Sequence, residues 1–180
     1  MLLFVAAAVR LYINTNPPLE KETKKKIVEE TNRARKIVIQ FQASSKTVKD
    51  LLSQVTSNSD KHDRKSIERQ LRFQFEIVLY QNNVTAEMRA PLAKMLARNS
   101  VDAVYVVKAE GGSIIVYFLC TTVKALFKFA QMITSGFLHE IFTEIIQSVT
   151  RTTVDVDTFV RAAEFNYRLL CLTSQQDRGW

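Results

Sequence analysis

Few residues of this chain combine the types and spacing that catalysis requires. Asp155 and Asp157 lie two residues apart in an alternating stretch, so on a strand their carboxylates would share one face, as an acid–base pair needs. No histidine is near them in sequence, and an edge-strand charge and a helix cap explain the two aspartates better. Gly111-Gly112 lacks the following lysine of a phosphate loop, and the chain has no Gly-x-Ser-x-Gly elbow. We therefore expect a protein that is not an enzyme.

Cysteine and histidine are equally poor candidates for a metal or cofactor site. Cys120 and Cys171 lie far apart in apolar surroundings, and neither His62 nor His139 stands at a familiar ligand spacing from them. Two buried, unpaired thiols are the simplest interpretation, and they suit a reducing compartment. We expect no metal, no cofactor and a cytoplasmic location.

The positive charge is concentrated in the first part of the chain. Of a net charge of +7, the range 20–72 contributes +6, from 14 basic and 8 acidic residues, whereas 73–180 has 10 of each. The 180 residues, 47% hydrophobic and 24% charged, describe a globular protein with a sizeable core. Because the later part is neutral, we expect no nucleic-acid partner.

The opening "MLLFVAAAVRLYI" is apolar but contains Arg10 and ends near Ile13, short of the ~20 residues that a membrane-spanning helix needs. Pro17-Pro18 separates this segment, 1–18, from the rest of the chain. We expect a helix that packs inside the protein, touches a membrane surface, or is the tail of a spanning segment cut off by the boundaries of this chain. In the second case the adjacent lysines would bind anionic lipid, namely Lys21, Lys24, Lys25 and Lys26.

A long helix is predicted over 19–57, because apolar positions recur there in alternating steps of four and three. This 3.5-residue period is typical of a coiled-coil seam. The residues predicted to form this seam are Ile27, Ala34, Val38, Phe41, Val48, Leu52 and Val55. The seam either pairs with a second chain, so that 19–57 self-associates, or packs onto its own domain.

A domain boundary is predicted at the polar stretch 58–70, which is typical of a linker. The adjoining "LRFQFEIVLY" alternates, with Leu71, Phe73 and Phe75 on one side, which predicts a half-buried strand. A helix then runs from Asn83 or Thr85 to about residue 99.

The remainder predicts a hairpin, two helices, a short strand and a last helix. The hairpin turns at Gly111-Gly112, and its second arm, "SIIVYFLC", is apolar on both faces, so we expect helices on each side of the sheet. Gly136 is expected to break the next helical region in a left-handed conformation. "RTTVDVD" predicts an edge strand, and Asp157 would cap the last helix.

These elements predict an α+β domain over 71–174, with a four-stranded antiparallel ferredoxin-like sheet of βαββαβ order covered by helices on both faces. A long N-terminal helical region would precede it. RNA-recognition domains share this topology, but "SIIVYFLC" lacks their Gly-aromatic pattern, which agrees with the absence of a nucleic-acid partner.

The range 71–173 resembles the N-terminal domain of TRADD, the TNF-receptor-associated death-domain adaptor. The resemblance rests on the order "VYVVKAEGGSIIVYFLC", "TTVKALFKFAQMITSGFLHEIFTEIIQSV", "TTVDVD" and "EFNYRLLCL". It implies an α/β sandwich that serves as a non-enzymatic adaptor in innate-immune or cell-death signalling, as a scaffold for other signalling proteins.

The resemblance also implies a docking surface for a TNF-receptor-associated-factor-like or death-fold protein. In the family the first strand and the hairpin take part in this contact. Carried over by position, the partner-binding candidates are Gln74, Glu76, Tyr80, Val106, Lys108 and Glu110. The alternative function is the membrane-surface module that binds lipid through the N-terminal segment and its lysines.

Overall fold

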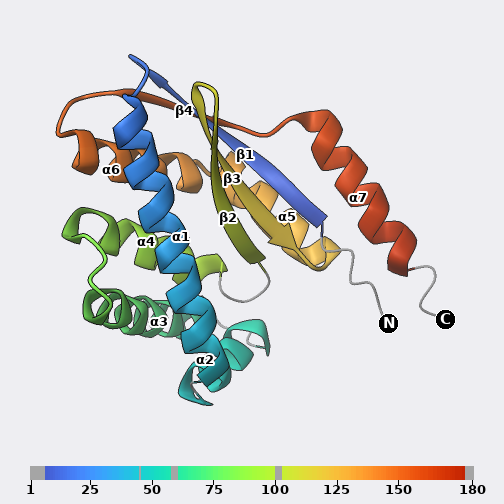
Figure 1. Ribbon diagram of the computed structural model, residues 1–180. Helices are drawn as coiled ribbons and strands as arrows, with labels where there is room; N and C mark the ends of the chain where they lie inside the picture. Colours follow the sequence, from blue (N-terminus) through green and yellow to red (C-terminus); the bar gives the residue numbers. More distant parts are fainter. Residues whose placement is uncertain (1–6, 45, 58–60, 100–102, 177–180) are drawn as a thin grey trace.

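A computed structural model describes residues 7–44, 46–57, 61–99 and 103–176 (Figure 1). Within these ranges the fold is mixed α+β, with seven helices and one four-stranded antiparallel sheet of order β2-β3-β1-β4. The strands are β1 (Ala7–Asn16), β2 (Ala103–Glu110), β3 (Ser113–Cys120) and β4 (Asp155–Phe159). The helices are α1 (Lys21–Ser44), α2 (Lys46–Ser57), α3 (Lys61–Gln81), α4 (Ala86–Asn99), α5 (Val123–Thr134), α6 (Phe137–Thr150) and α7 (Ala162–Gln176).

The N-terminal segment supplies a central strand, so the expectation of a helix there is wrong for 7–16. β1 lies between β3 and β4 and is antiparallel to both. Val9, Leu11 and Ile13 alternate with more polar positions and are at most 2% exposed, because one face of β1 lies on the core. These three side chains are therefore closed to a bilayer, which removes them as the anchor of the membrane-surface alternative.

The predicted long helix is two helices, α1 and α2, and its seam lies inside the protein. Ile27, Ala34, Val38 and Val48 belong to the buried core of this single chain. Phe41 is partly buried, with its ring 5.7 Å from that of Phe75 on α3. The side chains of Leu52 and Val55 lie outside the described part. Of the two alternatives for the seam, internal packing is the one that these positions adopt.

Helix α3 replaces both the predicted linker at 61–70 and the predicted strand at 71–80. Its buried positions are Ile67, Leu71, Phe75 and Leu79, which recur every four residues and so line one side of a helix. The helix ends before Asn83, whose φ of 57° is left-handed, and the Val84 N–H donates to the Leu79 carbonyl at 3.1 Å.

The elements after residue 83 largely agree with the prediction. α4, the hairpin turn at Gly111-Gly112 and the break at Gly136, with φ of 76°, are where the sequence places them. β4 is an edge strand, as expected, but it covers Asp155–Phe159. Asp157 therefore pairs with β1 inside this strand and does not cap α7, which begins at Ala162.

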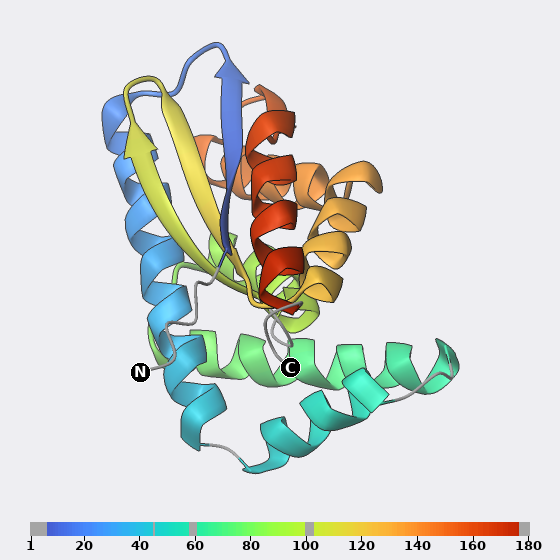
Figure 2. The ribbon, with the colours of Figure 1, turned by 90° about the vertical axis from the view of Figure 1, so that its right-hand side faces the viewer.

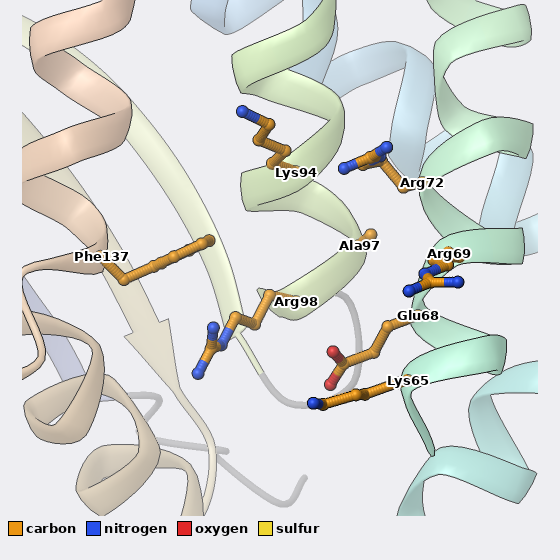
Figure 3. Close-up of a pocket in the computed structure, with 8 residues that line it drawn as sticks. All are labelled: Lys65, Glu68, Arg69, Arg72, Lys94, Ala97, Arg98 and Phe137. Carbon is orange, nitrogen blue, oxygen red and sulfur yellow. The ribbon is translucent and has the colours of Figure 1, made fainter. Parts of the chain in front are cut away.

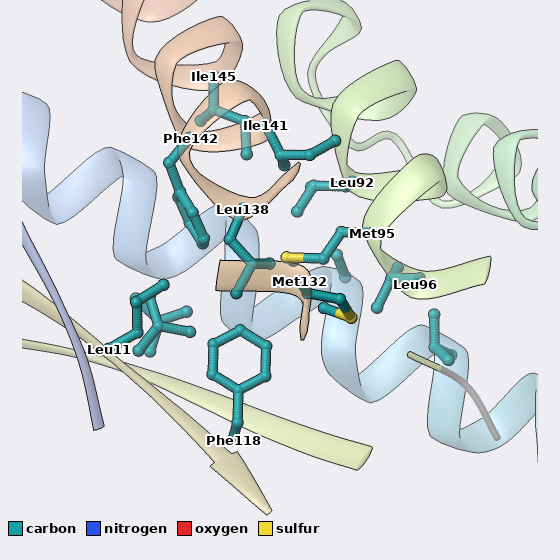
Figure 4. Packing of buried hydrophobic residues seen from close by; sticks show 14 of the residues in the cluster. Leu11, Leu92, Met95, Leu96, Phe118, Met132, Leu138, Ile141, Phe142 and Ile145 are labelled. Atoms are coloured by element: carbon teal, nitrogen blue, oxygen red, sulfur yellow. The ribbon is translucent and has the colours of Figure 1, made fainter. Parts of the chain in front are cut away.

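Helices α4, α5 and α6 pack on the face of the sheet that carries Leu11 and Phe118. The Phe118 ring lies 4.7 Å from that of Phe129 on α5. Figure 4 shows Leu11 and Phe118 facing side chains of α4, α5 and α6, among them Met95 and Leu138. α7 lies beside β1 in Figure 2 and contacts the other face, where Arg10 Nε donates to Glu164 Oε1 at 3.0 Å.

Candidate functional site

Helix α3 exposes three large apolar side chains on one side, which we call the apolar stripe. Phe73, Ile77 and Tyr80 are 61%, 37% and 67% exposed. Their i, i+4, i+7 spacing places them on one side of the helix, away from the buried positions. Scattered apolar side chains on a surface are ordinary, but three aligned on one helix form a continuous apolar ridge.

The stripe is held in a fixed place by the packing of α3. Phe75 and Leu79 are fully buried on the other side of the helix. At the C-terminal end, the Arg33 guanidinium donates to the Asn82 carbonyl, which ties α1 to the end of α3. The Arg89 guanidinium of α4 lies 4.6 Å from the centre of the Tyr80 ring, a cation–π contact. The ridge therefore belongs to a rigid scaffold rather than to a loop.

A basic pocket of about 250 Å³ adjoins this side of α3 (Figure 3). We call it the basic pocket. It lies between α3, α4 and α6, and α3 and α4 supply all of its charged lining residues. Its lining residues are Lys65, Glu68, Arg69, Arg72, Lys94, Ala97, Arg98 and Phe137. Five cationic side chains thus face one carboxylate, so the pocket has a strong positive excess.

The cations of the pocket differ in how they are neutralised. Lys94 Nζ lies 3.2 Å from Glu144 Oε1, so its charge is compensated by α6. The Arg98 guanidinium lies 4.5 Å from the centre of the Phe137 ring, which contributes no negative charge. Glu68, the acidic lining residue, is 3.5 Å from Arg64 Nε.

The α3 side of the pocket holds the uncompensated charge. Lys65, Arg69 and Arg72 are exposed and take part in no ion pair within the described ranges. Their i, i+4, i+7 spacing places them on one side of α3, next to the side that carries the stripe. Arg69 and Phe73 are four residues apart and are therefore neighbours on the helix surface, so the basic pocket and the apolar stripe adjoin each other.

The six partner-binding candidates do not form one surface. Gln74, Glu76 and Tyr80 lie on α3, because the strand predicted for them is a helix. Lys108 and Glu110 lie on edge strand β2, in a different part of the protein (Figure 1), and the Val106 side chain lies outside the described part. Of the six, Tyr80 belongs to the apolar stripe.

Lys108 and Glu110 form an exposed ion pair on the hairpin. The hydrogen bond and charge of Lys108 lower the pKa of Glu110, and those of Glu110 raise the pKa of Lys108. Both groups are open to solvent, so water screens this pair.

The residues considered for catalysis or metal binding are scattered. Asp155 and Asp157 are exposed on β4, whereas Cys120 is buried and Cys171 is half-buried. Among the described residues, no group of three or more His, Cys, Asp or Glu side chains is arranged to hold a metal ion.

Apart from Tyr80, the residues of the stripe and the pocket were not predicted from the sequence, because of the strand and linker assignments. The strand prediction placed Phe73 on the buried side of the strand, and the predicted linker contained Lys65 and Arg69. The i, i+4, i+7 spacing of Lys65, Arg69 and Arg72 indicates a helix, and it continues across the predicted boundary between linker and strand at residue 70.

In the described part of the chain, no helix has both the length and the apolar character needed to cross a bilayer. No family model matches this chain, and searches of curated proteins and of solved structures return no significant match.

Proposed function

We propose that this protein is a non-enzymatic interaction module that docks another protein on the apolar stripe of α3. The observation that carries the proposal is the exposure of Phe73, Ile77 and Tyr80 on one rigid helix. Burying exposed apolar side chains is the main favourable term in protein association, and aromatic residues and arginine are enriched at interface centres.

The charges beside the stripe specify the partner. Arg69, Arg72 and Arg89 lie next to the apolar side chains, which gives this surface a basic rim. A partner with an apolar centre and acidic flanking residues complements it, because opposite charges steer association and exclude partners of like charge. The occupant is therefore a protein with an acidic, apolar surface.

We also propose that the module is a cytoplasmic adaptor of the TRADD N-terminal type, acting among signalling proteins of innate immunity or cell death. Support comes from the residue patterns of 101–173 and from the strand order β2-β3-β1-β4 with antiparallel neighbours. A sheet with the split βαββαβ connection has this order, and the proposed fold class is accordingly ferredoxin-like.

A photo-crosslinking experiment tests the docking surface. A photoreactive phenylalanine analogue replaces Phe73 in the full chain, and the matched control carries it at Phe127, an equally apolar side chain on α5 that is 55% exposed. Irradiation in a cell lysate should give crosslinks from position 73 to a different protein through an acidic, apolar segment, and position 127 should not give them.

The recovered partner then allows a quantitative test. Replacing Tyr80 by alanine should weaken binding of the purified partner by at least about 30-fold, since a central aromatic contributes about 2 kcal/mol or more. Crosslinks from position 73 only to a second copy of this chain, only to lipid, or to the same proteins as position 127 would refute the proposal.

A further inference from the structure

We propose that the basic pocket binds the phosphoryl group of a phosphorylated serine or threonine in the docked partner. The identity of the partner segment rests on the proposed function, whereas the anion site rests on the pocket itself. Three features of the pocket support an anion site of this kind: its charge, its shape and its position beside the apolar stripe.

The charge of the pocket calls for an anion. Lys65, Arg69 and Arg72 have no carboxylate partner within the described ranges, and the Arg98 guanidinium lies over an aromatic ring. Glu68, the acidic lining residue, also pairs with Arg64, so it offsets only part of the charge of these cations. Like charges gathered on one concavity repel one another, and a bound anion relieves that repulsion.

The shape of the pocket favours a small group with dense charge. Its volume is about 250 Å³, below the usual size of a site for a drug-sized ligand. In Figure 3 the Arg69 and Arg72 side chains extend from α3 toward Ala97 on α4, whereas Lys94 and Arg98 extend toward the α6 side of the pocket. A phosphoryl group offers three acceptor oxygens and nearly two charges, and guanidinium groups bind such oxygens in pairs.

The position of the pocket beside the apolar stripe favours a peptide over a free anion. Arg69 lines the pocket, and Phe73, four residues further on and adjacent to it on the helix surface, begins the stripe, so one extended segment can reach both. A phosphorylated residue would enter the pocket while its apolar neighbours cover Phe73 and Ile77.

The test begins with the smallest probe of this chemistry. Capped phosphoserine (N-acetyl, C-amide) is titrated into the full chain and followed by NMR, with capped serine as the blank. Phosphoserine should shift the Arg69, Arg72 and Ala97 signals, and serine should not. Replacing both Arg69 and Arg72 by glutamine should weaken phosphoserine binding at least tenfold, whereas Glu68→Gln should strengthen it several-fold.

A charge-matched control separates a site from general attraction. Lys26→Gln with Lys124→Gln removes the same two charges from exposed positions outside the pocket and should change binding less than twofold. Melting temperatures of all variants show that each is folded. An equal loss in the control, or no shift of the pocket signals at millimolar phosphoserine, would overturn the proposal.

Two further arms identify the source of the phosphoryl group. Phosphatase treatment of the lysate should abolish the crosslinks from position 73 and leave those from position 127 unchanged. Phosphatidylcholine vesicles containing 5% phosphatidylinositol bisphosphate should not bind through Arg69 and Arg72; if they do while capped phosphoserine does not, the pocket is a lipid site instead. The Phe73→Ser variant should keep phosphoserine binding, so loss of docking and loss of anion binding are told apart.

Discussion

Asn32 closes the open edge of the sheet, and its replacement by alanine should measurably destabilise the protein. β2 is an edge strand, and α1 runs along it (Figures 1 and 2). The Asn32 amide donates to the Val107 carbonyl at 3.1 Å, and the Val107 N–H donates to Asn32 Oδ1 at 3.3 Å. One side chain thus imitates a neighbouring strand at this position. The Lys24 ammonium also donates to the Gly112 carbonyl in the hairpin turn.

The magnitude of the loss depends on two hydrogen bonds and one change in helix propensity. Each partly buried bond contributes roughly 0.5–1.5 kcal/mol net, and alanine returns up to about 0.7 kcal/mol of helix propensity. Asn32→Ala should therefore lower the free energy of unfolding by about 1.5 kcal/mol, which for a domain of this size lowers the melting temperature by roughly 3–6 °C.

Calorimetry and light scattering provide the assay, with Asn166→Ala as the matched control. Asn166 is exposed on α7 and has no side-chain hydrogen bond among the described residues, so its replacement gains propensity without losing a bond. Without Asn32, the N–H and carbonyl of Val107 should also be free to pair with a strand of another chain, and light scattering detects the resulting association. If both variants are equally stable and monodisperse, Asn32 does not protect this edge, and the reasoning fails.

Two further predictions concern α3 and the hairpin. In urea unfolding, Phe75→Ala should lower the free energy of unfolding by about 3–5 kcal/mol and Phe73→Ala by less than about 0.5 kcal/mol, because only Phe75 is buried. Similar losses of stability at both positions would support a strand instead of a helix. NMR titration should place the pKa of Glu110 below its ordinary value, and Lys108→Gln should raise it. Because the pKa of Glu110 is lower in the folded than in the unfolded protein, the ion pair stabilises the folded state at pH values above the unfolded pKa. This stabilisation is lost as the pH falls through the folded pKa. An unchanged titration of Glu110 in the Lys108→Gln variant would contradict the pairing.

The sequence predicts those elements whose signals are local. A turn with two glycines, a left-handed glycine between two helical stripes and an edge strand with outward charge are each specified by a few neighbouring residues. The hairpin, the α5–α6 break at Gly136 and the edge position of β4 were accordingly predictable.

The error at α3 has a geometric cause. Leu71, Phe75 and Leu79 are four apart, and a spacing of four satisfies both the two-residue period of a strand and the turn of a helix. Aromatic and β-branched residues in this stretch then favoured a strand. Phe73 and Ile77 distinguish a helix from a strand, because a strand would bury them together with Leu71 and Phe75, whereas the helix exposes them.

The error at β1 has a different cause, since the decisive interaction lies far away in sequence. An alanine-rich apolar stretch has good helix propensity, yet β3 requires a strand on the side away from β2. Ala7 to Ile13 pair with Cys120 to Ile114, more than a hundred residues away, and a single-sequence argument weighs only local preference.

The two errors together explain why the candidate site was not visible from the sequence. A polar stretch beside an alternating one is typical of a linker before a strand, and charged linker residues are treated as solvated. Once both belong to one helix, Lys65, Arg69 and Arg72 turn to the same side, and Phe73 begins the adjoining ridge. These apolar and cationic side chains are exposed on α3 and do not contribute to the core of the protein. Phe73 and Ile77, the side chains that distinguish a helix from a strand at α3, are therefore also the ones that keep apolar surface available for a partner.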